Sequence, residues 1–362
     1  MTWVAWRQFR TQAIVVFGGL AVLAVATVVT GLQLRQWTDG CTPSDSCLAL
    51  TEDAYGRFGW MQVLLRGGAL VLPAVTGMFC AAPLVARELE TGTFRVAWTQ
   101  SVSRSRWLAV KVLVVGTATL LASGLMSWMT TWWFGPSNRA EADKFVPTVF
   151  GTEDVVVLGY AAFAFAVGLT AGLLVRKVLS AMATTLGVYV AARLLVMMAI
   201  RPRFASPLTV TSTLQAGPTA GSLTTSLDIP DGSWVFGSQI FDPSGRLVRP
   251  PLRFGPEDAC FAAKTCLNGY LHRSLYQPWS RYWPFQWTET GLFAVLALVL
   301  IGFCFWWITG HRLPGGGARV ARAAAPRVPD ETAAPRVPDE RTARDRQVPE
   351  VVDQPRLTGA DR

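Results

Sequence analysis

One short polar segment between two long apolar stretches holds most of the residues whose types and spacing suggest a specific function. These residues are Glu88, Glu90, Gly92, Thr93, Phe94, Trp98 and Arg104. Phe94, Ala97 and Trp98 are spaced by three and four residues, so they share one face of a helix. The segment therefore combines one apolar helical face with two nearby acids.

The two acids of this segment need an explanation because their neighbours are mainly basic. Glu88 and Glu90 could pair with Arg87 and Arg95 of the same segment, or with basic residues of a partner protein. They could also do no more than neutralise a charged surface. The sequence leaves these alternatives open.

Enzyme motifs are absent from the sequence. It contains no G-x-x-x-x-G-K-[ST] phosphate-binding loop, no H-E-x-x-H and no G-x-S-x-G. With 2 histidines and no Cys-x-x-Cys pair, it also lacks a recognisable metal-binding pattern. We therefore expect no catalytic residues, no metal and no cofactor, and a function other than catalysis.

Six apolar stretches must position this segment, and each is long enough to cross a hydrocarbon core of about 30 Å as a helix. They cover residues 11–34, 67–86, 112–138, 155–175, 178–200 and 291–310. Apolar residues make up 51% of the chain and charged residues 16%, whereas a soluble domain carries about 25% charged residues. The sequence therefore predicts an all-α polytopic membrane protein with six transmembrane helices.

Arg193 is the one clear ionisable residue that we recognise inside these stretches. A charge within the membrane usually marks a functional site. Arg193 also lies near the predicted outer end of the fifth stretch, so its long side chain could reach the interface instead. Both interpretations remain open.

The distribution of basic residues predicts the orientation of the helices. If the amino terminus is cytoplasmic, the inner segments carry most of the arginines and lysines near the span ends, and the outer loops mix basic residues with acids. We expect both termini on the inside. The net charge of +9 then reflects topology and not nucleic-acid binding. The excess of arginine over lysine is typical of a GC-rich bacterial genome, so we expect a multi-pass protein of a bacterial inner membrane.

The cysteines agree with this orientation. Cys41 and Cys47 lie in the first outer loop, and Cys260 and Cys266 lie in the last one. Close pairs on an oxidising side are candidates for disulfides. The alternative is that all four remain as thiols.

The rest of the chain divides by composition. Residues 1–10 carry aromatic and basic residues that suit either an interfacial helix or an aromatic belt. Residues 11–200 hold helices one to five, 201–286 form a small, mostly irregular extracytoplasmic subdomain, and 287–310 form helix six. Residues 311–362 repeat Ala-Pro-Arg-Val-Pro-Asp-Glu and contain too few apolar residues to fold, so we expect a disordered cytoplasmic tail.

Two segments resemble a known family. The first is the acid-x-acid-x-Gly-Thr run from Glu88 to Thr93, followed by a helical piece, a Ser-x-Ser-Arg turn and Lys111. The second is the aromatic run at residues 276–287. Both are similar to the export-type (type-2) ATP-binding-cassette permeases, in particular to their actinobacterial subgroup. The resemblance covers roughly residues 1–312 and excludes the tail.

The resemblance implies a partner and a mechanism. In that family two six-helix subunits pair, and each meets a separate cytoplasmic ATPase through a coupling helix between spans two and three, here residues 88–98. Glu88 and Glu90 would face the ATPase or brace the helix, and Phe94 and Trp98 would insert into a groove of the ATPase. The outer segment before helix six is longer than in compact members, which leaves the shape of the outer gate undefined.

Two other functions compete with this hypothesis. A membrane-embedded enzyme would need polar groups converging at one depth, and the apolar stretches offer almost none. A sensor or envelope module would use the outer subdomain to bind a ligand without transport. The transported substrate cannot be deduced from the sequence.

Overall fold

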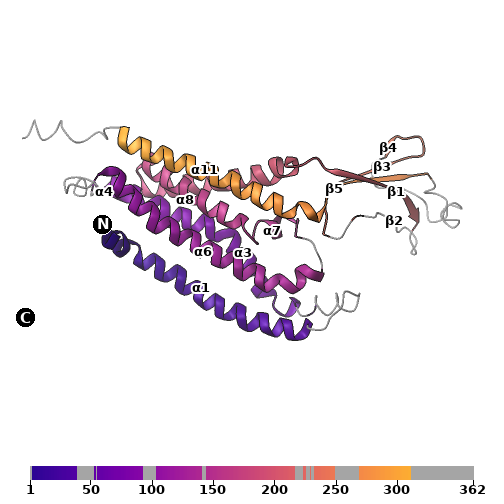
Figure 1. Ribbon diagram of the computed structural model, residues 1–362, viewed down its shortest axis with the longest axis horizontal. Helices are drawn as coiled ribbons and strands as arrows, with labels where there is room; N and C mark the ends of the chain where they lie inside the picture. The colour runs from indigo at the N-terminus through magenta and orange to yellow at the C-terminus, as the bar shows by residue number, and fades with distance from the viewer. Residues whose placement is uncertain are drawn as a thin grey trace, which may run out of the picture. The chain divides into compact units, whose positions relative to one another are not determined.

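Long helices form most of the structure, as the apolar stretches predict. We analyse a computed structural model of the chain, shown in Figure 1. The structure describes residues 2–38, 53, 55–92, 103–140, 144–216, 223–225, 229, 232–248 and 269–310. These all belong to the unit Met1–Arg312.

The long helices follow the predicted stretches, and the first, second, third and sixth of them extend beyond the predicted ends. They are α1 (Thr2–Thr38), α3 (Gly59–Thr76), α4 (Ala82–Thr91), α6 (Arg104–Ala140), α7 (Pro147–Phe150), α8 (Val156–Val175), α9 (Val178–Leu195) and α11 (Tyr282–Gly310). Short π- or 3-10-helical turns extend or join them: η1 (Gly77–Ala81), η2 (Val196–Ile200), η3 (Arg201–Arg203) and η4 (Trp279–Arg281). Because α3, η1 and α4 are continuous, they form one long helix with a π-helical turn inside it.

Within the described residues, 6 helices are long and apolar enough to cross a membrane. They are Phe9–Trp37, Gly59–Thr91, Arg104–Pro136, Val156–Val175, Val178–Arg203 and Trp279–Gly310. This confirms the predicted number of membrane-spanning helices. The helix ends differ from the prediction: α1 continues through the segment predicted to be interfacial, and α11 begins at Tyr282 instead of residue 287.

Helix α8 lies at the centre of the bundle, and its glycines explain how it packs there. Its residues are mostly buried, and it contacts α3, α4, α6, α9 and α11. A Cβ atom added to Gly172 would lie 2.5 Å from the carbonyl oxygen of Ala82, and one on Gly168 would collide with the carbonyl oxygen of Gly77. The Gly168-x-x-x-Gly172 spacing therefore lets α8 contact the η1–α4 backbone directly, as small residues do between membrane helices.

Hydrophobic clusters at the two ends of the bundle show which helix ends lie together. At one end, Val85 of α4, Trp107 of α6, Leu173 of α8 and Ile308 of α11 pack in one cluster. At the other end, a cluster contains the α7 residue Phe150 together with residues of α8, η2 and α11. The ends of α4, α8 and α11 therefore meet the start of α6, which Figure 1 also shows.

The segment between α9 and α11 contains an antiparallel sheet. Its strands are β1 (Leu208–Ala216), β2 (Leu223–Thr225), β3 (Trp234–Phe241), β4 (Leu247–Val248) and β5 (Leu271–Gln277), in the order β2-β1-β5-β3-β4. The prediction of an all-α protein with a mostly irregular segment here did not include this sheet. The central pairing joins Leu208 to Tyr276, which are too far apart in sequence for a local pattern to reveal it. The run of β-branched residues in Thr209–Thr213 was the available signal.

The sheet is attached to the bundle through the start of α11. The Gln277 side chain at the end of β5 donates a hydrogen bond to the carbonyl oxygen of Ala205 at 2.8 Å. The Trp234 ring of β3 stacks on Phe145, with 6.1 Å between ring centroids. Phe145 in turn packs edge-on against Tyr282 of α11. These contacts place the sheet at the α7 end of the bundle (Figure 1).

Candidate functional site

Glu88 ties the end of α4 to α6. Its carboxylate forms an ion pair with the Nζ atom of Lys111, at a distance of 2.6 Å. Lys111 is buried, and it also donates to the carbonyl oxygen of Leu84 at 3.0 Å and lies over the Trp107 ring. The pair is therefore shielded from water on the Lys111 side, where its Coulombic attraction is stronger than at the surface. The two helices are joined at this point by a charge and not by apolar packing alone.

Glu90 ties the same end of α4 to α9. Its carboxylate accepts a hydrogen bond at 3.0 Å from the backbone N–H of Val178, the first residue of α9. The N-cap residue of α9, Lys177, makes no side-chain capping bond. A carboxylate at a helix N-terminus satisfies a backbone donor and interacts favourably with the helix dipole. Glu90 thus supplies the cap that the local sequence of α9 lacks.

The described contacts of the two acids lie within this chain. Both acids bond to neighbouring helices of this chain, Glu88 to Lys111 and Glu90 to Val178, and so brace the end of α4. Sequence reasoning missed both partners, although it had noted Lys111 at the start of the next span. It had no means of finding Val178, because the donor is a backbone group that is specified only by the fold.

The remaining predicted coupling residues lie around a gap in the described structure. Helix α4 ends at Thr91, and its C-cap residue Gly92 has a φ of 74°, in the left-handed region where glycine is favoured. Arg104 is the first residue of α6, and the Ser103 hydroxyl accepts a hydrogen bond from the backbone N–H of Arg106 at the start of that helix. Thr93, Phe94 and Trp98 lie outside the described residues.

Arg193 points into the protein and bonds to the α7 turn. Its guanidinium donates to the carbonyl oxygen of Gly151 at 2.8 Å and to the Tyr189 hydroxyl at 3.1 Å. It also lies over the Tyr160 ring, 4.3 Å from the ring centroid. Arg193 therefore stabilises the end of α7 by satisfying the carbonyl oxygen of its C-cap residue.

A buried ion pair that the sequence reasoning did not find lies nearby. Arg201 in η3 contacts Glu289 in α11 with nitrogen–oxygen distances of 2.7 and 2.9 Å, and the Tyr160 hydroxyl donates to the same carboxylate at 2.5 Å. Arg201 and Glu289 are almost completely buried. Arg201 and Glu289 each lie just outside an apolar stretch that hydropathy predicts, 178–200 and 291–310. A lone acid beside the last apolar stretch was the signal that could have revealed them.

Further polar side chains connect α11 to the turn before α8. The Tyr282 hydroxyl donates to the Asp154 carboxylate at 2.6 Å. Gln286 accepts from the backbone N–H of Val156 at 3.0 Å and donates to the carbonyl oxygen of Phe150 at 3.1 Å. Polar groups thus do meet inside the bundle, although the apolar stretches suggested almost none. Their bonds are to one another and to backbone, as expected of a structural network.

The cysteines predicted to form disulfides, Cys41, Cys47, Cys260 and Cys266, lie outside the described residues, so their pairing stays a prediction. Cys80 and Cys304 are buried free thiols. Across the described ranges, histidine, cysteine, aspartate and glutamate form no group that could hold a metal ion.

Comparison with known proteins identifies the helical bundle. A family model described as "ABC-2 membrane transporter related" matches residues 17–201, slightly more than half of the 362-residue chain. The matched region begins in α1 and ends at the first residue of η3, so it includes α4, Lys111 and Arg193. Neither curated proteins nor solved structures gave a match.

Proposed function

Because this chain belongs to the ABC-2 membrane transporter related family, we propose that it is the permease subunit of an ATP-driven exporter. It forms the membrane pathway and couples in trans to a separate cytoplasmic ATPase. Six apolar helices and the family match support a multi-pass membrane permease. The absence of a phosphate-binding loop from the sequence is consistent with ATP binding to another subunit.

The bracing of α4 is the observation that carries the coupling proposal. Glu88 joins α4 to Lys111 of α6, and Glu90 joins it to Val178 of α9. These two contacts hold the end of α4 to α6 and α9, and α4 and α6 are the helices that residues 93–102 connect in the sequence. A partner that moves this segment would move three helices at once, and its binding energy could shift the balance between two permease conformations.

The proposed orientation places this end of the bundle in the cytoplasm. Arg87, Arg104, Arg106, Arg176 and Lys177 lie at or next to the helix ends found here. Such a concentration of basic residues is typical of cytoplasmic loops. The sheet would then lie outside the cell, at the opposite end of the bundle. The inner membrane of a bacterium and pairing with a second permease subunit complete the proposal.

Pull-down of the proposed cytoplasmic ATPase tests the coupling role. We expect the double variant Trp98→Ala/Glu90→Arg to insert into the membrane normally and to lose the ATPase. The substitution at Trp98 removes a proposed apolar anchor, and the one at Glu90 places a positive charge at the N-terminus of α9. Arg57→Ala, at the opposite end of the bundle, is the matched control and should retain the ATPase.

The outcome separates the proposal from its alternative. An unchanged pull-down for Trp98→Ala/Glu90→Arg would show that the α4–α6 segment is not the docking surface. If the wild-type chain itself retained no ATPase under conditions in which it is inserted, a non-transporting sensor module would explain the chain better. If the wild-type chain retains the ATPase and the double variant loses it, growth of a deletion strain against a panel of amphipathic toxins identifies the class of exported substrate.

A further inference from the structure

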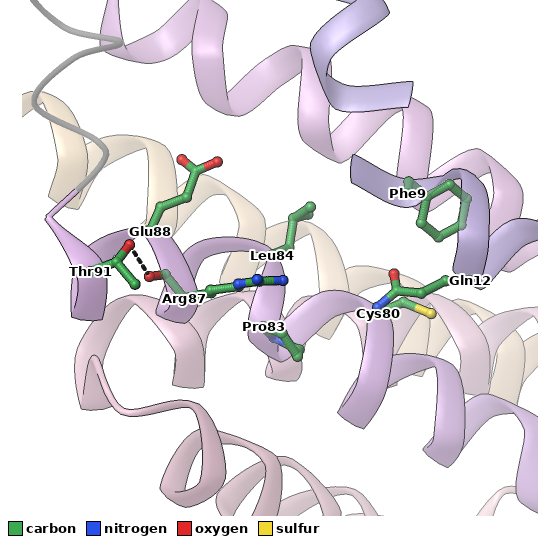
Figure 2. A pocket seen from close by; sticks show the side chains of 8 residues that line it. All are labelled: Phe9, Gln12, Cys80, Pro83, Leu84, Arg87, Glu88 and Thr91. Atoms are coloured by element: carbon green, nitrogen blue, oxygen red, sulfur yellow. Dashed lines mark hydrogen bonds between the residues drawn. The ribbon is translucent and has the colours of Figure 1, made fainter. Parts of the chain in front are cut away.

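A pocket of about 420 Å³ lies between the start of α1 and the η1–α4 helix. Its lining residues are Phe9, Gln12, Cys80, Pro83, Leu84, Arg87, Glu88 and Thr91, as Figure 2 shows. A volume of this size is within the range of about 300–1,000 Å³ that small-molecule sites occupy. The coupling proposal uses Glu88 on its rim but gives no role to the cavity itself.

The π-helical turn η1 shapes the inner part of the pocket. The Gln12 side chain of α1 donates a hydrogen bond at 3.1 Å to the carbonyl oxygen of Phe79, which belongs to this turn. Phe9 and Cys80 pack in one hydrophobic cluster beneath it. A π-helical turn inside an α-helix often occurs at a functional site. Here the turn supplies a carbonyl oxygen that binds Gln12 of α1, next to the apolar side chains of Phe9 and Cys80.

The charges around the pocket are unbalanced. Figure 2 shows the Arg87 guanidinium directed along α4 towards Gln12, whereas the Glu88 carboxylate points away from it. Glu88 is already paired with Lys111 at 2.6 Å. Among the residues that the structure describes, no carboxylate forms a salt bridge with Arg87. The pocket therefore presents one uncompensated cation beside apolar side chains.

We propose that this pocket binds an anionic phospholipid, with Arg87 contacting its phosphate and with Phe9 and Leu84 contacting the beginning of an acyl chain. A guanidinium presents paired donors that match phosphate oxygens, and such charge-assisted bonds are stronger than neutral ones. The apolar residues next to Arg87 favour an amphiphile over a free anion. The inference rests on the proposed function only in placing this end of the bundle at the cytoplasmic leaflet, whose surface is negative.

Equilibrium binding to the detergent-purified, full-length chain tests this site. The probe is a fluorescent phosphatidylglycerol analogue, with the phosphatidylcholine analogue as the neutral comparison and inorganic phosphate as a competitor. We expect phosphatidylglycerol to bind more tightly than phosphatidylcholine, and Arg87→Gln to weaken phosphatidylglycerol about tenfold. The affinity of Arg87→Lys for phosphatidylglycerol should lie between those of the wild type and Arg87→Gln. Arg106→Gln, at the exposed start of α6 outside the pocket, should bind like the wild type.

Several outcomes would overturn the inference. Equal affinities for wild type and Arg87→Gln, or an equal loss in Arg106→Gln, would show that the lipid binds elsewhere or through general charge. If inorganic phosphate displaced the phosphatidylglycerol probe, the site would take a free anion instead of a lipid. Size-exclusion elution checks that each variant is folded. Pull-down of the ATPase by the wild-type chain is measured in parallel. A wild-type chain that retains the ATPase but does not bind phosphatidylglycerol more tightly than phosphatidylcholine rejects this inference alone.

Discussion

Arg201 and Glu289 are 88 residues apart in sequence and form a two-point ion pair in the interior of the bundle. Their side chains are 2% and 1% exposed. The pair connects η3, at the end of the fifth membrane helix, with α11, and Tyr160 of α8 donates to the same carboxylate. Three helices thus depend on one charged contact, at the end of the bundle opposite to the braces made by Glu88 and Glu90.

Removing one charge of this pair should destabilise the protein strongly. Glu289→Gln keeps the shape of the side chain but leaves the Arg201 charge buried without its counter-ion, so we expect the free energy of unfolding to fall by about 3–5 kcal/mol. The apolar double variant Arg201→Met/Glu289→Leu should recover most of this loss. Thermal unfolding in detergent measures both effects.

The exposed pair of Asp53 and Arg57 provides the matched control. Its side chains are 66% and 62% exposed at a distance of 2.9 Å, and Asp53→Asn should change stability by less than about 1 kcal/mol. If Glu289→Gln were as stable as Asp53→Asn, the buried pair would not hold the helices together.

Close packing of α8 predicts a strong effect of a single methyl group. Gly168→Ala would place a Cβ against the backbone of η1, so we expect a loss of about 1–3 kcal/mol from overpacking. Gly187→Ala in α9 meets nothing within 4 Å and should be neutral or slightly stabilising. Comparing the thermal midpoints of the two variants tests this, and equal midpoints would contradict the tight contact between α8 and η1.

Cysteine labelling in intact cells checks the proposed orientation. Thr91→Cys, at the exposed end of α4, should react with a thiol reagent only after the membrane is permeabilised, because we place that end in the cytoplasm. Ser244→Cys, in the exposed turn before β4, should gain label from an impermeant reagent without permeabilisation. Thiols that are already accessible from outside are blocked first in the Thr91→Cys experiment. The reverse labelling pattern would show that the orientation is inverted. The proposed ATPase docking site would then lie on the wrong side of the membrane.

The turn between β3 and β4 should loosen in acid. Hydrogen bonds lower the pKa of Asp242 below its usual value, first the one from the Ser244 hydroxyl and then the one from the backbone N–H of Arg246. Since the pKa is lower in the folded state, this contribution to stability is complete above about pH 3.9 and is lost as the pH falls through the folded pKa.

Hydrogen–deuterium exchange of the β3–β4 turn measures this effect. After correction for intrinsic rates, exchange should rise below about pH 3.9. In Asp242→Asn it should not depend on pH, because the amide still accepts hydrogen bonds but does not titrate in this range. A wild-type turn whose protection is equal at pH 7 and in acid would contradict the role of Asp242.

The sequence by itself determined the membrane class, the number of spanning helices and the position of the α4–α6 segment. These properties depend on local runs of residues, since about twenty consecutive apolar residues favour a membrane helix whatever lies elsewhere in the chain. The same reasoning located Glu88 and Glu90 as unusual. It also missed the sheet, because β1 and β5 are paired by residues that are distant in sequence.

Only the tertiary structure decided which groups these residues meet. Glu90 bonds to a backbone N–H of α9, and Arg201 finds Glu289 because η3 and α11 lie side by side. Hydropathy measures the cost of transferring one segment into the bilayer, whereas a buried charge is stabilised by whichever opposite charge the packing of helices brings near it. That packing is set by close contacts such as those of Gly168 and Gly172 with η1 and α4, and no single segment contains the information that specifies both sides of a contact.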